Sequence, residues 1–185
     1  IESIRAVGEV EALKKMDQRE LVIKEIIQRT PGVKSFRLGV REWKDYKAGQ
    51  FLCVSLKTEK QCKRYLSISS SPTEKGYIEF TKKITESDFS SMINTYKPGD
   101  NVIVEYPLGK FTLDETYPKV ALISGGIGIT PIRSICKYAV DKKLNTDIIL
   151  MYANQTVNTI AFKEDLDDLQ KKHPRLKVIH VLSET

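Results

Sequence analysis

Apolar and polar residues follow one pattern in the first part of the chain and another in the second part. Between residues 20 and 105, short apolar or alternating runs are separated by turn residues such as Thr30-Pro-Gly32. This pattern predicts antiparallel strands joined by tight turns. The expected strands cover residues 21–27, 33–38, 51–56, 77–84 and 101–105, with one short helical stretch at 89–96. Many short strands in series indicate a small barrel or sandwich.

After Phe111 the apolar runs alternate with amphipathic segments. We expect strands at 119–124, 147–153 and 177–182, with helices at 130–142 and 159–172. This alternation predicts a parallel sheet with right-handed helical crossovers. The second helix is the better marked, because Phe162, Leu166 and Leu169 share one face and Pro174 follows its end.

The chain is therefore predicted to have two domains. An antiparallel β-barrel domain covers residues 19–113, and an α/β parallel-sheet domain covers residues 114–185. Residues 1–18 are charged and carry apolar residues at helical spacing, so we expect a short N-terminal arm there.

Composition excludes several classes of protein. The net charge is +6, and the lysines are spread along the chain rather than clustered, so the sequence does not favour nucleic-acid binding. A solvated basic surface explains the positive charge more simply than an acidic partner does. Apolar runs fall short of the ~20 residues of a membrane span. Cys53, Cys62 and Cys136 are odd in number and form no C-x-x-C pair, which favours a reducing, cytoplasmic compartment over a disulfide, zinc or iron–sulfur protein. His173 and His180 are interpreted as structural, so no metal site is expected.

A glycine-rich loop is the most specific local feature of the sequence. An apolar run ends at Gly125, Gly126 and Gly128, and Thr130 and Pro131 follow at once. Glycines let a backbone turn tightly and approach a ligand, while Pro after Thr is a helix-start signal. A strand, a glycine-rich loop and a helix N-terminus in this order favour the binding of an anion such as a pyrophosphate. The alternative is a turn without a ligand, since proline replaces the third glycine of the dinucleotide fingerprint.

Six segments, taken in order, resemble the ferredoxin–NADP reductase superfamily of flavin-dependent oxidoreductases. They are Ala48-Gly-Gln-Phe51, Arg64 to Pro72, Lys97-Pro-Gly-Asp100, Tyr106-Pro-Leu-Gly-Lys-Phe111, Gly125 to Pro131 and Leu150-Met-Tyr-Ala-Asn154. The resemblance runs from about Glu20 to the last residue. It implies a flavin-binding barrel followed by an NAD(P)-binding domain. Closest in character are reductase subunits that exchange electrons between NAD(P)H and iron–sulfur or oxygenase partners.

The resemblance assigns roles to the segment that begins at Arg64. The family motif is Arg-x-Tyr-Ser/Thr, and Arg64 and Ser67 match it. Arg64 would clamp a flavin phosphate, and Ser67, the catalytic candidate, would hydrogen-bond flavin N5. Leu66 replaces the aromatic residue, which keeps apolar cover for the ring but loses stacking. Tyr65 completes this set of cofactor-binding candidates, although strand alternation directs it to the other side. The alternative for Arg64 is a surface ion pair.

A second phosphate-binding motif of the family is Gly-x-x-Ser at the start of the helix in the barrel domain. Ser90 matches its serine, Ser87 replaces its glycine, and Phe89 lies between them. Asp88 must point outwards if a phosphate binds there. The resemblance implies a bound flavin, with FAD favoured over FMN; an ordinary N-capped helix is the alternative.

In the second domain, the resemblance places the glycine loop under a nicotinamide dinucleotide and Thr130 near the nicotinamide. Asn154 ends the second strand of this domain, and Ser183 and Glu184 follow the third. Relatives that use NADP often carry Ser-Arg at these last two positions. Glu184 would instead repel a 2′-phosphate and accept from a ribose hydroxyl, so NADH is favoured over NADPH.

The family continues with two more strand–helix units, including a Cys-Gly-x-x-x-Met segment, that are absent from this sequence. The α/β domain is therefore expected to be truncated: either the chain is a portion of a longer protein, which we favour, or a partner chain completes the sheet. A sheet of three strands would expose the face of its first strand. The implied function is hydride transfer from NAD(P)H to bound flavin, with electrons passing to a separate redox protein or partner subunit. The alternatives are a free-flavin reductase and a non-catalytic flavin-binding subunit of a larger redox complex.

Overall fold

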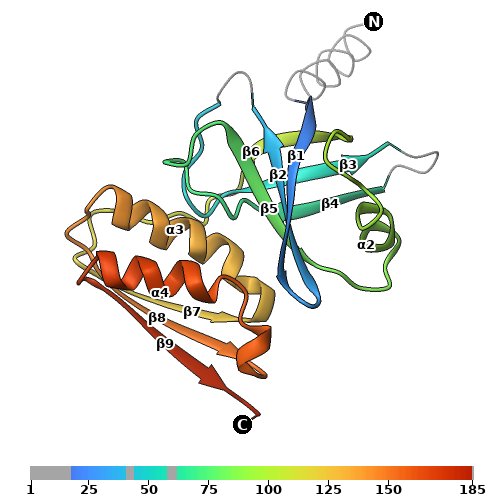
Figure 1. The fold of residues 1–185 in the computed structure, drawn as a ribbon. Coiled ribbons are helices and arrows are strands. Elements are labelled where there is room, and N and C mark those ends of the chain that lie inside the picture. Colours follow the sequence, from blue (N-terminus) through green and yellow to red (C-terminus); the bar gives the residue numbers. More distant parts are fainter. Residues whose placement is uncertain (1–17, 41–43, 58–61, 185) are drawn as a thin grey trace, which may run out of the picture.

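The structure, a computed structural model, describes residues 18–40, 44–57 and 62–184. It contains two parts in chain order, a barrel of antiparallel strands and a parallel sheet with helices on one face (Figure 1). The predicted two-domain fold is therefore confirmed. The expected N-terminal arm lies outside the described residues except for Gln18, which begins the first strand.

Six strands in the order β4-β3-β6-β1-β2-β5 form the barrel. They are β1 (Gln18–Thr30), β2 (Val33–Gly39), β3 (Phe51–Leu56), β4 (Cys62–Ser67), β5 (Tyr77–Lys83) and β6 (Asn101–Leu108). A bridge between Ile68 and Phe80 joins the two outer strands and closes the barrel. Inward residues such as Ile23, Phe36 and Leu52 are fully buried, which is why the alternating runs predicted these strands.

Helix α2 (Asp88–Ile93) packs against β3 and β4 of the barrel. Ser87 is its N-cap and accepts a hydrogen bond from the Ser90 backbone N–H at 3.4 Å. Phe89 and Ile93 are fully buried and hold the helix to the barrel core. The helix ends earlier than the predicted residue 96 because Asn94 begins a turn.

The second domain contains three parallel strands and two helices. The strands are β7 (Lys119–Gly125), β8 (Asp147–Asn154) and β9 (Leu176–Leu182), and the helices are α3 (Ile129–Asp141) and α4 (Lys163–Lys172). Short 3₁₀ turns, η1 (Gly126–Gly128) and η2 (Val157–Thr159), follow β7 and β8.

Two predicted helix starts in this domain differ from the structure. Helix α3 starts at Ile129 with Gly128 as its N-cap, so Thr130 lies within the first turn rather than capping it. The predicted helix at 159–172 starts only at Lys163, because Phe162 adopts a left-handed backbone with φ of 61°. Residues 157–159 form η2 instead.

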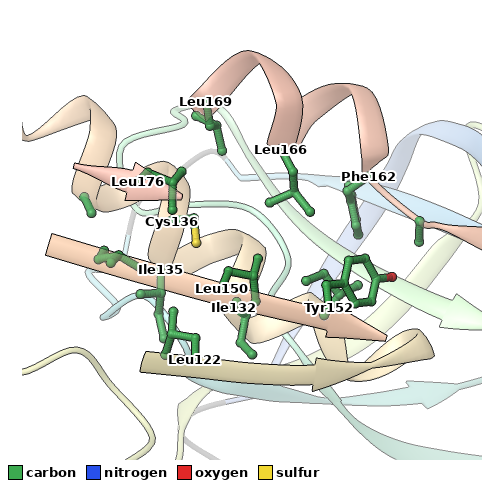
Figure 2. Close-up of a cluster of buried hydrophobic side chains, with 14 of the residues drawn as sticks. Leu122, Ile132, Ile135, Cys136, Leu150, Tyr152, Phe162, Leu166, Leu169 and Leu176 are labelled. Carbon is green, nitrogen blue, oxygen red and sulfur yellow. The ribbon is translucent and has the colours of Figure 1, made fainter. Parts of the chain in front are cut away.

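One face of the parallel sheet packs against both helices (Figure 2). Leu122, Leu150 and Tyr152 point from the strands towards Ile132 on α3 and Leu166 on α4 (Figure 2). The opposite face carries exposed apolar side chains from all three strands, namely Ile123, Ile149, Met151, Ile179 and Val181. Ile123 on the first strand, β7, is 73% exposed, which agrees with the expected exposure of the face of that strand.

The barrel and the sheet domain share apolar contacts. Val33 and Ala48, from the barrel, belong to the hydrophobic core of the second domain. Gly49 has a φ of 98°, and a Cβ there would lie 2.3 Å from the Phe111 backbone oxygen. A Cβ there would also lie 3.1 Å from Ile135 Cδ1 on α3, so Ala48 and Gly49 lie where the barrel contacts the second domain.

Candidate functional site

A cavity of about 580 Å³ lies between the carboxyl ends of the parallel strands and the β1–β2 turn of the barrel. Gly126, Asn154 and Ser183 line it from the sheet side, and Lys83 lines it from the barrel side. Parallel sheets bind ligands at this edge, and the volume suits a small-molecule or cofactor site. The fold therefore brings together three residues that the sequence predicts for a dinucleotide, and adds Lys83, which it does not predict.

A side chain could be added at each of the three glycines of the loop without a close clash. A Cβ on Gly126 would meet nothing within 4 Å, one on Gly125 would lie 4.0 Å from the Ala153 oxygen, and one on Gly128 would lie 3.6 Å from Ser124 Oγ. Packing therefore requires none of them to be glycine. Gly126 is also favoured by its φ of 50°.

Buried side chains hold this loop in place. The Tyr152 hydroxyl donates to the Gly126 carbonyl at 3.0 Å. Burial raises the pKa of Tyr152 to about 12, so the hydroxyl keeps its proton and remains a donor at neutral pH. Thr130 Oγ1 donates to the Ile127 carbonyl at 3.3 Å. Thr130 thus supports the loop, and Pro131 follows it in the first turn of α3.

Two buried polar atoms beside the loop lack hydrogen-bond partners within the described part of the chain. They are Ser124 Oγ and Asn154 Nδ2. Both residues are only 8% exposed. An unpaired buried polar group costs about 1–3 kcal/mol, so such groups point to a missing partner. A polar ligand in the cavity would satisfy the Asn154 amide. Asn154 is predicted from the sequence, whereas Ser124 is not.

On the barrel, Arg64 lies close to Lys82 of the neighbouring strand β5. Burial, and then the charge of Arg64, lower the pKa of Lys82. Among the described residues, neither side chain forms an ion pair; Arg64 donates to the Lys63 carbonyl and Lys82 to the Lys83 carbonyl, each at 3.2 Å. Two adjacent cations without a carboxylate favour an anionic ligand. The sequence does not predict the contribution of Lys82.

The remaining residues of this segment divide between the two sides of β4. Leu66 is half-buried and packs against the barrel core. Tyr65 is 63% exposed and contacts the Phe51 ring edge-on, with 5.9 Å between ring centroids. Tyr65 lines a separate shallow pocket with Lys63, so it lies on the other side from Leu66, as strand alternation predicts. Ser67 is half-buried at the end of the strand.

The serines at the start of α2 bond to one another. Ser90 is fully buried, and its Oγ lies 3.1 Å from both Ser87 Oγ and Thr85 Oγ1. The Phe89 side chain is enclosed by the barrel core. These contacts describe a capped helix, and a role for Ser87, Phe89 and Ser90 towards a phosphate stays a prediction.

The residues after β9 are held beside the cavity by backbone bonds. The Ser183 N–H donates to the Asn154 carbonyl at 3.1 Å, and the Glu184 N–H donates to the Gln155 carbonyl at 2.9 Å. Both side chains are exposed. Glu184 therefore lies next to the cavity that Ser183 lines, and its contact with a ribose stays a prediction.

Other reactive groups give no second site. Burial raises the pKa of the Cys136 thiol to about 12, which makes it unreactive. His173 is buried, and His180 lies 3.7 Å from Asp167. Within residues 18–40, 44–57 and 62–184, no cluster of three potential metal ligands occurs, and no helix is long and apolar enough to cross a membrane.

The chain forms a closed barrel with two adjacent cations, and a parallel sheet with a glycine loop and a cavity follows it. This combination is typical of two-domain oxidoreductases that bind a flavin and a nicotinamide nucleotide. Residues 18–113 match the family of oxidoreductase FAD-binding domains, and residues 122–185 match the family of oxidoreductase NAD-binding domains. The chain belongs to the ferredoxin–NADP reductase superfamily. The matches confirm the expected cofactors, FAD for the barrel and a nicotinamide dinucleotide for the α/β domain.

Several known proteins are similar to this chain. NADH-cytochrome b5 reductase 1 of Dictyostelium discoideum is 37% identical over 120 residues, which cover 62% of this chain and 41% of the relative. The ferredoxin reductase component of 3-ketosteroid-9-alpha-monooxygenase from Mycolicibacterium smegmatis is 30% identical over 175 residues, covering 88% of this chain and 49% of the relative.

The fold is also found in solved structures. The cytochrome b5 reductase domain of Ulva prolifera nitrate reductase has a TM-score of 0.78 and 24% identity, covering 89% of this chain and 73% of that one. The chain spans about half of the length of the curated relatives that it matches, with 41%, 49% and 54% for three of them.

Proposed function

We propose that this chain forms the cofactor-binding part of a reductase in which hydride passes from NADH to bound FAD and electrons then pass to a separate redox protein. The observation that carries this proposal is the cavity, where the buried unpartnered amide of Asn154 lies beside the open backbone of Gly126. A relative named as the ferredoxin reductase component of a monooxygenase supports onward transfer to a protein partner.

The residues present fit both cofactors. Arg64 and Lys82 would neutralise the phosphates of FAD, because they form an adjacent cationic pair without a carboxylate in the described structure. Ser67 would hydrogen-bond the flavin ring at N5. Asn154 and the backbone of Gly126 would bind the dinucleotide. The bound flavin supplies the redox chemistry, accepting hydride and releasing electrons, while the protein supplies position and electrostatics.

The direct test is the colour and reduction of the purified full-length protein. It is expected to be yellow, to release FAD on denaturation, and to lose its visible flavin absorbance when NADH is added anaerobically. Absorbance spectroscopy and chromatography of the released flavin measure both results. A colourless protein that stays colourless after incubation with FAD and with FMN would contradict the proposal.

A free-flavin reductase is the second candidate, favoured by one observation. Leu66 is aliphatic and packs partly into the barrel core, so this position supplies no aromatic ring to stack on a flavin. A protein that binds FAD weakly and releases reduced flavin during turnover would fit this candidate instead. Equilibrium dialysis during turnover separates the two functions.

The coenzyme preference depends on Glu184 in our proposal. A carboxylate beside the adenosine ribose would repel the 2′-phosphate of NADPH but not the hydroxyl of NADH. Exchanging Glu184 for Arg is therefore expected to shift the ratio of kcat/KM for NADPH over NADH upwards by roughly tenfold. Steady-state kinetics with both coenzymes measure this ratio in the full-length protein.

Asp168→Arg is the matched control, because Asp168 is an exposed carboxylate on α4 that pairs with Lys171 and does not line the cavity. It makes the same change of charge and should leave the ratio unchanged. A wild-type protein that already prefers NADPH would refute the assigned role of Glu184.

A further inference from the structure

Two consecutive residues of α3 connect the helix that follows the glycine loop with the segment that follows β4. Helix α3 starts directly after the glycine loop, and Arg133 and Ser134 lie in its second turn. The Ser134 hydroxyl donates to the Ser70 carbonyl at 2.6 Å, and Arg133 Nη1 donates to the Ser69 carbonyl at 3.2 Å. Both carbonyls lie two or three residues after Ser67. The bonds therefore join the two elements that must bring nicotinamide and flavin together.

The segment that receives these bonds is itself held firmly on the barrel. The Ser69 N–H donates to the Glu79 carbonyl at 2.7 Å, and Ser69 Oγ donates to the Glu79 carboxylate at 2.9 Å. Glu79 is 1% exposed and is paired with Arg29 and Arg37. A displacement of α3 would therefore act on a segment that hydrogen bonds tie to β5.

Arg133 extends the connection to a second helix. It is 5% exposed and forms ion pairs with Glu74 of the barrel and Asp165 of α4. Burial alone would lower the pKa of Arg133, but the two carboxylates outweigh burial and raise it. Burial likewise favours a higher pKa for Glu74, yet Arg133 holds that pKa below its usual range. Both groups therefore stay charged, and the ion pair persists at neutral pH.

Apolar contacts also hold the two domains together. Val33 and Ala48 of the barrel pack into the core of the second domain, which supplies a non-directional apolar contact. The bonds of Arg133 and Ser134 are directional and buried, so they fix the relative position of surfaces that already adhere. Hydride transfer needs reacting atoms about 3–3.5 Å apart, and a misplacement of 1 Å costs about 100-fold in rate.

We infer that Arg133 and Ser134 are positioning residues, which set the distance between nicotinamide and flavin without touching either. The inference rests on the proposed function. Removing the Ser134 hydroxyl loses one cross-domain bond, while the Ser70 carbonyl keeps the hydrogen bond from the Tyr46 hydroxyl at 3.0 Å. Ser134→Ala therefore leaves no buried carbonyl unpaired and is expected to fold.

The experiment is anaerobic stopped-flow reduction of the FAD-loaded full-length protein over a range of NADH concentrations. For Ser134→Ala we expect the limiting rate of flavin reduction to fall about tenfold, because part of the alignment is lost. The Kd for NADH and the Kd for FAD should stay at their wild-type values, while the melting temperature should fall only by the small amount that loss of one hydrogen bond causes. Arg133→Lys, which keeps the charge but loses the planar fork of donors, should act in the same direction.

Thr146→Val is the matched control for a lost buried hydroxyl. Thr146 is 3% exposed and donates to the Tyr117 carbonyl at 3.1 Å, at the end of the domain away from the cavity. It should leave the limiting rate unchanged. The role of Arg133 and Ser134 is overturned if both variants are reduced at the wild-type rate, or if their rates fall only in proportion to lost FAD. A wild-type protein that NADH does not reduce would instead refute the proposed function.

Discussion

Replacing Gly126 by valine is expected to lower kcat/KM for NADH on the order of 100-fold while FAD remains bound. Gly126 lines the cavity with open space where a Cβ would stand, so a branched side chain would occupy the space of the ligand. The residue also has a φ of 50°, which valine tolerates poorly. Steady-state kinetics with NADH and the flavin content of the purified variant measure the two effects.

A substitution at a second glycine distinguishes backbone strain from blocked ligand binding as the cause of the Gly126→Val effect. Gly76 has a φ of 88°, and a Cβ there would meet nothing within 4 Å, but it lies in the turn before β5, away from the cavity. Gly76→Val imposes the same kind of strain, which costs about 1–3 kcal/mol of stability. It should lower the melting temperature without changing the NADH dependence. Equal losses of NADH turnover in both variants would attribute the Gly126 effect to strain.

The pattern of apolar residues predicted most of the fold, because most elements bury one face. Strand β3 was predicted with the bounds that the structure shows, since most of its residues are buried and it follows a clear turn signal. Strand β4 did not stand out in the pattern, because it carries Lys63, Arg64 and Tyr65 on its exposed positions. The start of α4 was predicted wrongly, because the left-handed Phe162 that delays it depends on packing into the core rather than on local sequence.

The sequence predicted candidate site residues only where they lie together in one short segment of the chain. The glycine loop and Asn154 follow directly from strand ends, so the sequence places them at one edge of the sheet. Lys82 was missed because β4 and β5 become neighbours only when the barrel closes, and Lys83 because the cavity forms only where the two domains meet. Ser134 was missed for a similar reason, as its partner lies 64 residues away on another domain.

Some segments that resemble the family contribute to the fold rather than to chemistry. The Asp100 carboxylate accepts a hydrogen bond from the Lys97 N–H at 2.6 Å, and its carbonyl accepts one from the Ile23 N–H at 2.8 Å. Gly49 allows the close approach to Phe111. The first set of bonds shapes the barrel, and Gly49 also leaves room for α3, because a Cβ there would lie 3.1 Å from Ile135 Cδ1. These two family segments therefore stabilise the fold in the described structure.

The second large effect is expected at the flavin site, where Arg64→Ala should weaken FAD binding by about 1.5–3 kcal/mol, the range for a hydrogen bond to a charged group. This corresponds to a rise in Kd of roughly 10- to 150-fold. Removing Arg64 leaves Lys82 as the remaining cation of the pair, so binding should weaken rather than disappear. Fluorescence titration of the apoprotein with FAD measures the Kd.

Lys63→Ala is the control for loss of a positive charge on the same strand. Lys63 lies beside Arg64 but lines the shallow pocket with Tyr65, on the other side of β4. A long-range effect of net charge would weaken FAD binding in both variants and would fade as salt is added. A direct contact of Arg64 with a phosphate would weaken it in Arg64→Ala alone. Unchanged FAD affinity in Arg64→Ala would remove this residue from the flavin site, because the bond to the phosphate is the basis of its assigned role.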